Sequence, residues 1–304
     1  PARAEAGAFP LENCAKGAFS TEEDFTMQNS EPYDGDPVIS DGDLLSRNGP
    51  LCARNRDLLA AFAGDKRIPD LGLDAVDILD IPDRILALST EIDDPGGSFT
   101  AGDLLLTTGA VIPNRALMHL LDPDAPQQAD VGLDAVQFIG TRDNKVQFVN
   151  AISGISRDEL IKDPGQLQAL LERHKVDIWF SIEGTLGLPA SPTILDGDLL
   201  SASGTVVVKQ QALLPPSTPA GIPVRGVDFG LDAIQTEPTA NAEIALSRLT
   251  FSTEILYWGE PAFTDGDVVK LGNGVVTPNA VLVGPFKPAA DADGQRRGLT
   301  HAAG

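Results

Sequence analysis

The sequence has 304 residues, of which 44 are acidic and 22 basic, so its net charge is −22. This charge repels phosphate backbones and anionic lipid surfaces, which makes nucleic acids and acidic membranes poor partners and cations or basic proteins better ones. No run of about 18 apolar residues occurs, so no membrane insertion is expected.

The N-terminal sixth of the chain suggests export. The sequence starts at Pro1 without an initiator Met, as a mature chain does after its leader has been removed, although a trimmed form would look the same. Cys14 and Cys52 are its two cysteines, and no CxxC or Cys/His metal spacing surrounds them. We predict a disulfide between them, with two buried free thiols as the alternative. A secreted, extracellular protein is expected.

One phrase occurs four times in nearly the same letters. Asp-Gly-Asp, or once Ala-Gly-Asp, is followed by three mostly apolar residues, at Asp41–Ser46, Ala101–Leu106, Asp196–Ser201 and Asp265–Lys270. Such repetition is typical of a repeat architecture.

Two further motifs recur in register with this phrase. Upstream, a strand-like run ends in Ser-x-Glu, at Ala18–Glu22, Ala87–Glu91, Trp179–Glu183 and Thr250–Glu254. Downstream, Gly-Leu-Asp-Ala occurs at Gly72–Ala75, Gly132–Ala135 and Gly230–Ala233. From the second Asp of the phrase to the Asp of Gly-Leu-Asp-Ala the distance is 31, 31 and 34 residues, too constant for chance.

These motifs predict an all-β fold of four tandem repeats, each of about four short strands. The apolar runs are short, rich in Val, Ile, Leu and Phe, and bounded by Gly, Pro, Asn and Asp. The repeats would form a propeller-like ring or a linear β array. The predicted segments are an N-terminal segment at 1–17, repeat 1 at 18–80, repeat 2 at 81–140, a helical insertion at 141–177, repeat 3 at 178–236 and an incomplete repeat 4 at 237–304.

The insertion between repeats 2 and 3 carries helix signals. Ser156 and Glu159 form a capping box, and Asp163–Pro164 fit an N-cap and a first helical residue. Two short helices are predicted, with apolar sides formed by Leu160, Ile161, Leu167, Leu170 and Leu171. The alternative is a linker that divides the chain into two halves of two repeats each.

These phrases (FSxE, DGDLL, GLDA) resemble tandem β repeats of large secreted bacterial proteins of unassigned function, over almost the whole chain. That resemblance implies an extracellular setting and no particular activity. A weaker resemblance is to hemopexin-type four-bladed propellers, in which an Asp-Ala pair opens each inner strand. Asp74–Ala75, Asp134–Ala135 and Asp232–Ala233 match that pair, while the aromatic signature of those blades is absent.

The two ends of the sequence differ from the repeats. Where repeat 4 should carry Gly-Leu-Asp-Ala, the sequence has Gly298–His301 (GLTH). Glu5–Ala6 precede Ser20 by 15 residues, the same distance as Asp74–Ala75 before Ser89. We therefore interpret residues 1–17 as a candidate closing strand, which pairs with its own chain or is donated to a neighbouring copy in head-to-tail self-assembly.

The recurrent acids are the candidate metal ligands. Carboxylate and carbonyl oxygens in sets of six to eight suit Ca²⁺, so Ca²⁺ is the candidate cofactor, although no loop has the EF-hand spacing. The alternative is that these residues only form turns and cap backbone amides. The candidates are Glu22, Asp41, Asp43, Asp74, Glu91, Asp103, Asp134, Glu183, Asp196, Asp198, Asp232, Glu254, Asp265 and Asp267.

No enzyme is predicted. The nucleophile motif G-x-S-x-G, the zinc motif H-E-x-x-H and the P-loop are absent, and acids that recur equally in every unit favour architecture over one asymmetric catalytic site. His119, His174 and His301 are isolated, and we interpret Trp179 and Trp258 as core residues. The expected function is a self-assembling extracellular filament or surface-layer subunit. The alternative is a monomeric propeller-like module that binds a ligand or carbohydrate, with Ca²⁺.

Overall fold

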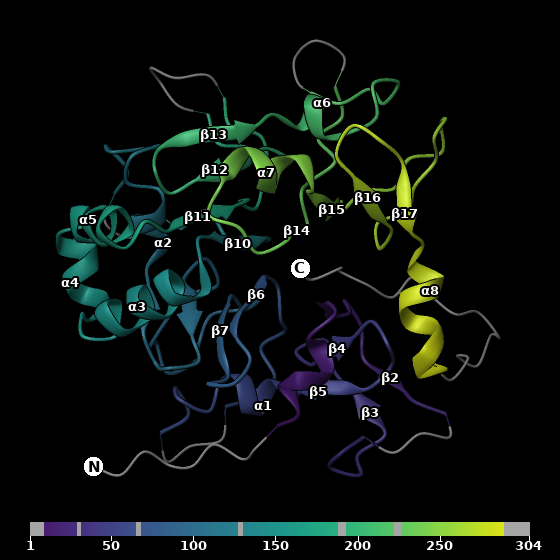
Figure 1. The fold of residues 1–304 in the computed structure, drawn as a ribbon, viewed down its shortest axis with the longest axis horizontal. Helices are drawn as coiled ribbons and strands as arrows, with labels where there is room; N and C mark the ends of the chain where they lie inside the picture. The colour runs from purple at the N-terminus through teal and green to yellow at the C-terminus, as the bar shows by residue number, and fades with distance from the viewer. Residues whose placement is uncertain are drawn as a thin grey trace.

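The computed structural model describes residues 9–28, 32–64, 68–126, 130–187, 193–221 and 226–288. In these residues, short strands form five small antiparallel sheets with few helices. The four larger sheets follow one another in chain order around the middle of the molecule (Figure 1).

The larger sheets are built from consecutive strands, with one exception. The first sheet has the order β1-β4-β5, and the others have the orders β6-β7-β8-β9, β10-β11-β12-β13 and β14-β15-β16-β17. The small fifth sheet pairs β2 with β3. The strands are β1 (Ala18–Phe19), β2 (Phe25–Thr26), β3 (Val38–Ile39), β4 (Leu44–Ser46), β5 (Leu51–Ala53), β6 (Val76–Asp80), β7 (Ile85–Leu88), β8 (Leu104–Leu106), β9 (Val111–Ile112), β10 (Val136–Ile139), β11 (Asp177–Phe180), β12 (Leu199–Ser201), β13 (Thr205–Val208), β14 (Ala233–Gln235), β15 (Thr250–Ser252), β16 (Val268–Lys270) and β17 (Val275–Thr277).

The helices are short and lie between strands or after the last strand of a sheet. They are α1 (Asn55–Leu58), α2 (Asn114–Leu117), α3 (Arg142–Ile152), α4 (Arg157–Lys162), α5 (Gly165–His174), α6 (Gln210–Leu213), α7 (Ala242–Ser247) and α8 (Asn279–Val283), with 3-10 helices η1 (Leu11–Cys14) and η2 (Gly284–Phe286).

Each recurrent motif occupies the same place in its sheet. Gly-Leu-Asp-Ala leads into the first strand of the second, third and fourth sheets, the Ser-x-Glu run contains the next strand, and the Asp-Gly-Asp phrase leads into the strand after that. Each of these three sheets therefore begins with the strand that follows Gly-Leu-Asp-Ala. The predicted repeats instead begin at the next strand, so their boundaries are displaced by one strand from those of the sheets.

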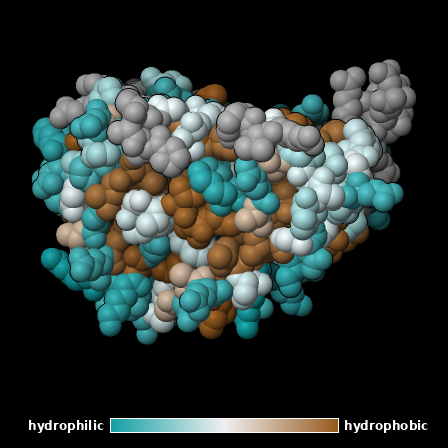
Figure 2. Space-filling view, turned by 90° about the horizontal axis from the view of Figure 1, so that it is seen from above, coloured by the Kyte–Doolittle hydropathy of each residue, from teal (hydrophilic) through white to brown (hydrophobic). Residues whose placement is uncertain are grey.

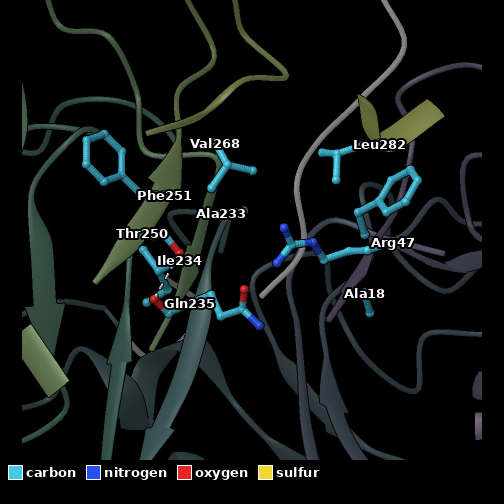
Figure 3. A pocket seen from close by; sticks show the side chains of 10 residues that line it. Ala18, Arg47, Ala233, Ile234, Gln235, Thr250, Phe251, Val268 and Leu282 are labelled. Atoms are coloured by element: carbon cyan, nitrogen blue, oxygen red, sulfur yellow. Dashed lines mark hydrogen bonds between the residues drawn. The ribbon is translucent and has the colours of Figure 1, made fainter. Parts of the chain in front are cut away.

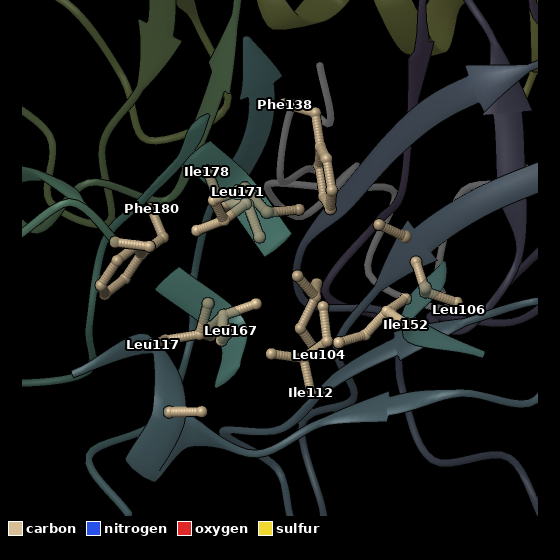
Figure 4. Close-up of a cluster of buried hydrophobic side chains, with 14 of the residues drawn as sticks. Leu104, Leu106, Ile112, Leu117, Phe138, Ile152, Leu167, Leu171, Ile178 and Phe180 are labelled. Atoms are coloured by element: carbon tan, nitrogen blue, oxygen red, sulfur yellow. The ribbon is translucent and has the colours of Figure 1, made fainter. Parts of the chain in front are cut away.

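Alternate residues of the strands face different cores. In β7, Leu86 and Leu88 belong to the core that joins the first two sheets, whereas Ile85 and Ala87 belong to the core that joins the second and third. Figure 4 shows this second core, where Leu167 and Leu171 of α5 face strand residues that include Phe180. A third core joins the third and fourth sheets. The period-two burial of the strands thus stacks the sheets face against face.

The helical insertion forms as three helices. Ser156 and Glu159 make the predicted capping box at the start of α4, and α5 follows Pro164. A third helix, α3, begins at the N-cap Thr141 and was not predicted. All three connect β10 to β11, which pair in one sheet, and bury apolar side chains on the second core.

The surface carries both hydrophilic and hydrophobic residues. Figure 2 faces the side on which β13 lies in Figure 1, and hydrophobic residues are visible across the middle of this face. Val206–Val208 of β13 are half-buried. Among the described helices, none is long and apolar enough to span a membrane.

The prediction of a mostly β fold is confirmed, because the described residues form antiparallel sheets with few helices. The predicted disulfide between Cys14 and Cys52 is also confirmed. The described residues form no closed propeller. The first sheet has three strands, and β1 pairs only with β4.

Candidate metal centre

Seven of the fourteen candidate ligands line one cavity of about 460 Å³, which we call the carboxylate cavity. They are the Glu of every Ser-x-Glu motif and the Asp of every Gly-Leu-Asp-Ala motif, namely Glu22, Asp74, Glu91, Asp134, Glu183, Asp232 and Glu254. No described Lys, Arg or His lines this cavity. Acids that are far apart in sequence therefore meet at one place in the fold.

The glycine of Gly-Leu-Asp-Ala makes room for the glutamate of the neighbouring strand. Gly132 has φ +70°, and a Cβ built there would lie 2.6 Å from the side chain of Glu183. Gly72 stands in the same relation to Glu91, and Gly230 to Glu254. A side chain at these positions would be strained and would push the glutamate aside, so the motif directs the glutamate into the cavity.

Asp74 and Asp134 line the cavity, and each has a buried oxygen without a hydrogen-bond partner. Asp74 Oδ2 and Asp134 Oδ2 accept no hydrogen bond, and the two residues are only 9% and 5% exposed. An unpaired buried charge is costly unless the group stays protonated or a cation binds it. These two oxygens are free to ligate a positively charged group in the cavity.

The pKa values of the cavity acids are raised. Burial, followed by the nearby carboxylates of Asp74 and Glu254, raises the pKa of Asp134 to about 10. Burial and Asp196 raise the pKa of Glu254 to about 8. Burial also raises the pKa of Asp74 well above its ordinary value. These shifts favour the protonated form of Asp134 and Glu254 at neutral pH, and a bound cation would displace those protons.

Two sets of oxygens are close enough together to share an ion. One ligand atom from each of Asp74, Asp134 and Glu183 lies within 4.8 Å of the others, and the same is true of Asp134, Asp196 and Glu254. Because Ca²⁺–oxygen distances are about 2.3–2.6 Å, two oxygens on one ion lie at most about 5 Å apart. Asp134 belongs to both sets and can bridge them.

The second Asp of each Asp-Gly-Asp phrase has a different role. Asp103 accepts hydrogen bonds from the N–H groups of Thr100 and Asn114, both at 3.0 Å, which closes the turn and holds the first residue of α2. Asp43, Asp198 and Asp267 make the equivalent pair of bonds at α1, α6 and α8. Three of the four also pair with a basic side chain, Asp43 with Arg54, Asp103 with Arg157 and Asp198 with Lys209. These bonds explain why the phrase recurs.

The first Asp of the phrase does not line the carboxylate cavity in any sheet, but in the third sheet it lies close to two residues that do. Asp196 joins Asp134 and Glu254 in the second ligand set. Asp41 and Asp265 do not line the carboxylate cavity, and the second sheet has Ala101 at this position.

A third series of acids was missed in the sequence. Asp70, Asp130 and Asp228 each lie two residues before the glycine of Gly-Leu-Asp-Ala. Their charges raise pKa values at the cavity, as Asp130 does for Glu183 and Asp228 for Asp196. The recurrence of Asp-x-Gly-Leu-Asp-Ala was the available signal.

The prediction that both tryptophans are core residues is correct for one of them and wrong for the other. Trp179 is buried in the third core, but Trp258 is 78% exposed, in the loop that follows β15. His119 and His174 do not line the carboxylate cavity, and His301 lies outside the described residues.

No protein-family model, curated protein or solved structure matches this chain.

Proposed function

We propose that this chain is an extracellular calcium-binding β module of propeller-like form, in which Ca²⁺ in the carboxylate cavity holds the four larger sheets together. The observation that carries this proposal is the pair of buried, unpartnered oxygens of Asp74 and Asp134, which lie in a cavity with no described basic side chain.

The ligand chemistry favours a hard cation. All candidate ligands are carboxylates, and Asp74, Asp134, Glu183, Asp196 and Glu254 supply enough oxygens for the six to eight that Ca²⁺ takes. Mg²⁺ requires a tighter octahedral arrangement, and soft metals prefer thiolate or imidazole ligands. Ca²⁺ therefore fits a wide carboxylate cavity best.

The disulfide supports the extracellular part of the proposal. Disulfides persist mainly in oxidising compartments, and extracellular calcium modules use millimolar Ca²⁺ with weak sites. A weak site would suffice there to keep the cavity occupied.

The geometry gives less support to self-assembly through the N-terminal segment. Residues 1–8 of that segment lie outside the described residues. The following Leu11–Cys14 form the 3-10 helix η1, where Asn13 donates a hydrogen bond to the Leu51 carbonyl of β5 in the same chain. The described part of the segment thus packs on its own first sheet.

Carbohydrate binding is a second candidate, favoured by Trp258. An exposed indole offers a large apolar face with a polar N–H. Replacing Trp258 with Ala should abolish retention on an immobilised polysaccharide that the native protein binds, and leave calcium binding unchanged. Equal retention of both proteins would rule out Trp258 as the platform.

Isothermal titration with CaCl₂ tests the calcium proposal. The unchanged chain should bind Ca²⁺, the double variant Asp74→Asn, Asp134→Asn should not, and Asp124→Asn, an exposed turn residue, should bind as the unchanged chain does. The double variant should still fold, because it removes groups whose charge the cavity disfavours. Equal binding by all three proteins, or no binding at millimolar Ca²⁺, would refute the proposal.

A further inference from the structure

A second large pocket lies at the other end of the strands that lead away from the carboxylate cavity. The Asp of each Gly-Leu-Asp-Ala lines the carboxylate cavity and comes just before β6, β10 or β14. The far ends of these strands, at Asp80, Gly140 and Gln235, line a pocket of about 730 Å³. The first sheet adds Cys14–Gly17, before β1, and Arg47, after β4. All four larger sheets therefore line this pocket, whose volume suits a small-molecule ligand.

The charge of this pocket is opposite to the net charge of the chain. Five basic and three acidic side chains line it, which leaves it with a charge of +2 in a chain of charge −22. We call it the basic pocket. The bases are Lys16, Arg47, Arg142, Lys145 and Arg248, and the acids are Asp77, Asp80 and Glu237.

Three of the bases are neutralised inside the basic pocket. They pair with its three acids, Arg142 with Asp80, Arg248 with Glu237, and Lys145 with Asp77 at 3.6 Å. Arg142 and Lys145 lie one turn apart on α3 and both reach β6. The helical insertion therefore supplies two of the bases, and each has its charge matched by the protein.

The other two bases, Lys16 and Arg47, form no ion pair with any described residue. Arg47 donates one described side-chain hydrogen bond, from Nη2 to the Thr277 hydroxyl at 3.2 Å. Its stem lies against Gly17, where φ is +119° and a Cβ would lie 2.5 Å from Arg47 Cδ. A glycine thus gives this arginine its place, as the glycines of Gly-Leu-Asp-Ala do for the glutamates of the carboxylate cavity.

Two amide side chains add hydrogen-bond donors without acceptors. Gln137 lines the basic pocket and is 5% exposed, and its Oε1 accepts a hydrogen bond from the Thr236 N–H at 3.0 Å. No described residue accepts a hydrogen bond from its Nε2, and none bonds to the side chain of Gln235. Figure 3 shows Gln235 and Arg47 directed into the space between the fourth and first sheets. Donors left without acceptors in a pocket are met by water or by an acceptor-rich ligand.

We propose that the basic pocket binds a small ligand through a doubly charged anionic group, which is either a tetrahedral oxyanion or a dicarboxylate. The two uncompensated charges of Lys16 and Arg47 match the charge of a dianion, and a guanidinium can donate two parallel hydrogen bonds to a pair of anionic oxygens. Gln137 and Gln235 supply neutral donors. The proposal does not rest on calcium binding, because none of these four residues lines the carboxylate cavity.

The acids of the carboxylate cavity are too distant to prevent anion binding. Asp74 and Asp80 are separated by six residues of extended chain, which span about 20 Å. This distance is more than twice the Debye length of about 8 Å at physiological ionic strength. The nearby cations therefore decide which charge the basic pocket accepts.

Isothermal titration with sodium sulfate and with sodium succinate, each at an ionic strength held constant with NaCl, tests the proposal. The unchanged chain should bind at least one of these dianions saturably at millimolar concentration. Binding of sulfate alone assigns the site to a tetrahedral oxyanion, and binding of succinate alone assigns it to a dicarboxylate. Binding of both shows recognition by charge. No saturable binding of either anion would overturn the proposal.

Two pairs of substitutions place the bound anion. Lys16→Gln, Arg47→Gln removes the two uncompensated charges from exposed positions and should weaken binding about tenfold or more. Lys162→Gln, Arg173→Gln removes two exposed bases outside the basic pocket and should bind as the unchanged chain does. Both double variants should bind calcium normally. If the two bind the anion equally well, the proposal is overturned.

A third variant changes a donor and keeps both cations. Gln235→Glu preserves the size of the side chain but replaces its N–H donor with a carboxylate oxygen near Arg47. The added negative charge should weaken anion binding, with the melting temperature as the check that the variant is folded. A folded Gln235→Glu variant that binds the anion as tightly as the unchanged chain would contradict a site at this place.

Discussion

Glu183 passes directly over Gly132, so closely that a Cβ on the glycine would lie 2.6 Å from the glutamate side chain. The two residues belong to different recurrent motifs and are brought together by the pairing of β10 with β11. This relationship joins the two motifs and positions one of the cavity carboxylates.

We expect Gly132→Ala to weaken both stability and calcium binding. The positive φ and the contact with Glu183 should together cost about 1–3 kcal/mol of unfolding free energy, and the displaced carboxylate should lower calcium affinity. Denaturant unfolding measures the loss of stability, and calorimetric titration measures the loss of calcium affinity. Gly187→Ala, where a Cβ meets open space, should have little effect on either. Equal behaviour of the two variants would contradict the role given to Gly132.

Asp103→Asn should destabilise the protein equally with and without calcium. Asp103 is buried and accepts bonds from two backbone N–H groups and from Arg157 Nε at 2.6 Å. Loss of its charge should cost about 2–4 kcal/mol. Asp267→Asn is the matched comparison, since Asp267 makes the same two backbone bonds and no described ion pair, and it should cost less. A loss that is larger in calcium than in chelator would assign Asp103 to the metal centre instead.

The calcium-free protein should become less stable as the pH rises from about 5.5 to 8. The pKa values of Asp134 and Glu254, about 10 and about 8, lie above the unfolded values of about 4. Between these limits the folded state binds more protons than the unfolded state, so the free energy of unfolding falls with pH. Melting curves in chelator measure this change. Asp74→Asn, Asp134→Asn should show a flatter dependence, and a melting temperature that rises with pH would contradict the prediction.

Much of the local structure could be predicted from sequence because local signals specify it. The capping box of Ser156 and Glu159 contains its own partners, and the turn formed by Asp103 closes within three residues. α3 was missed because its buried face is narrow, with Phe148, Val149 and Ile152 as its apolar contacts. Residue type alone predicts Trp258 to be a core residue, whereas it is exposed in the loop that follows β15.

The cavity could be predicted only in part. The spacing of Asp74, Asp134 and Asp232 showed that these residues are equivalent, but not that they face one another, because that depends on how separate sheets pack. Likewise, the sequence did not distinguish Asp103, which is occupied by backbone N–H groups, from Asp134, whose Oδ2 has no partner. Packing between sheets decides which acids form turns and which line the cavity.

Anomalous scattering from crystals grown in calcium would test the central claim most directly. The account predicts a calcium peak in the carboxylate cavity, about 2.3–2.6 Å from oxygens of Asp74 and Asp134. Crystals of Asp74→Asn, Asp134→Asn under the same conditions should lack it. A cavity without a peak in the unchanged protein, or calcium found only at the turns of Asp41 and Asp265, would contradict the account.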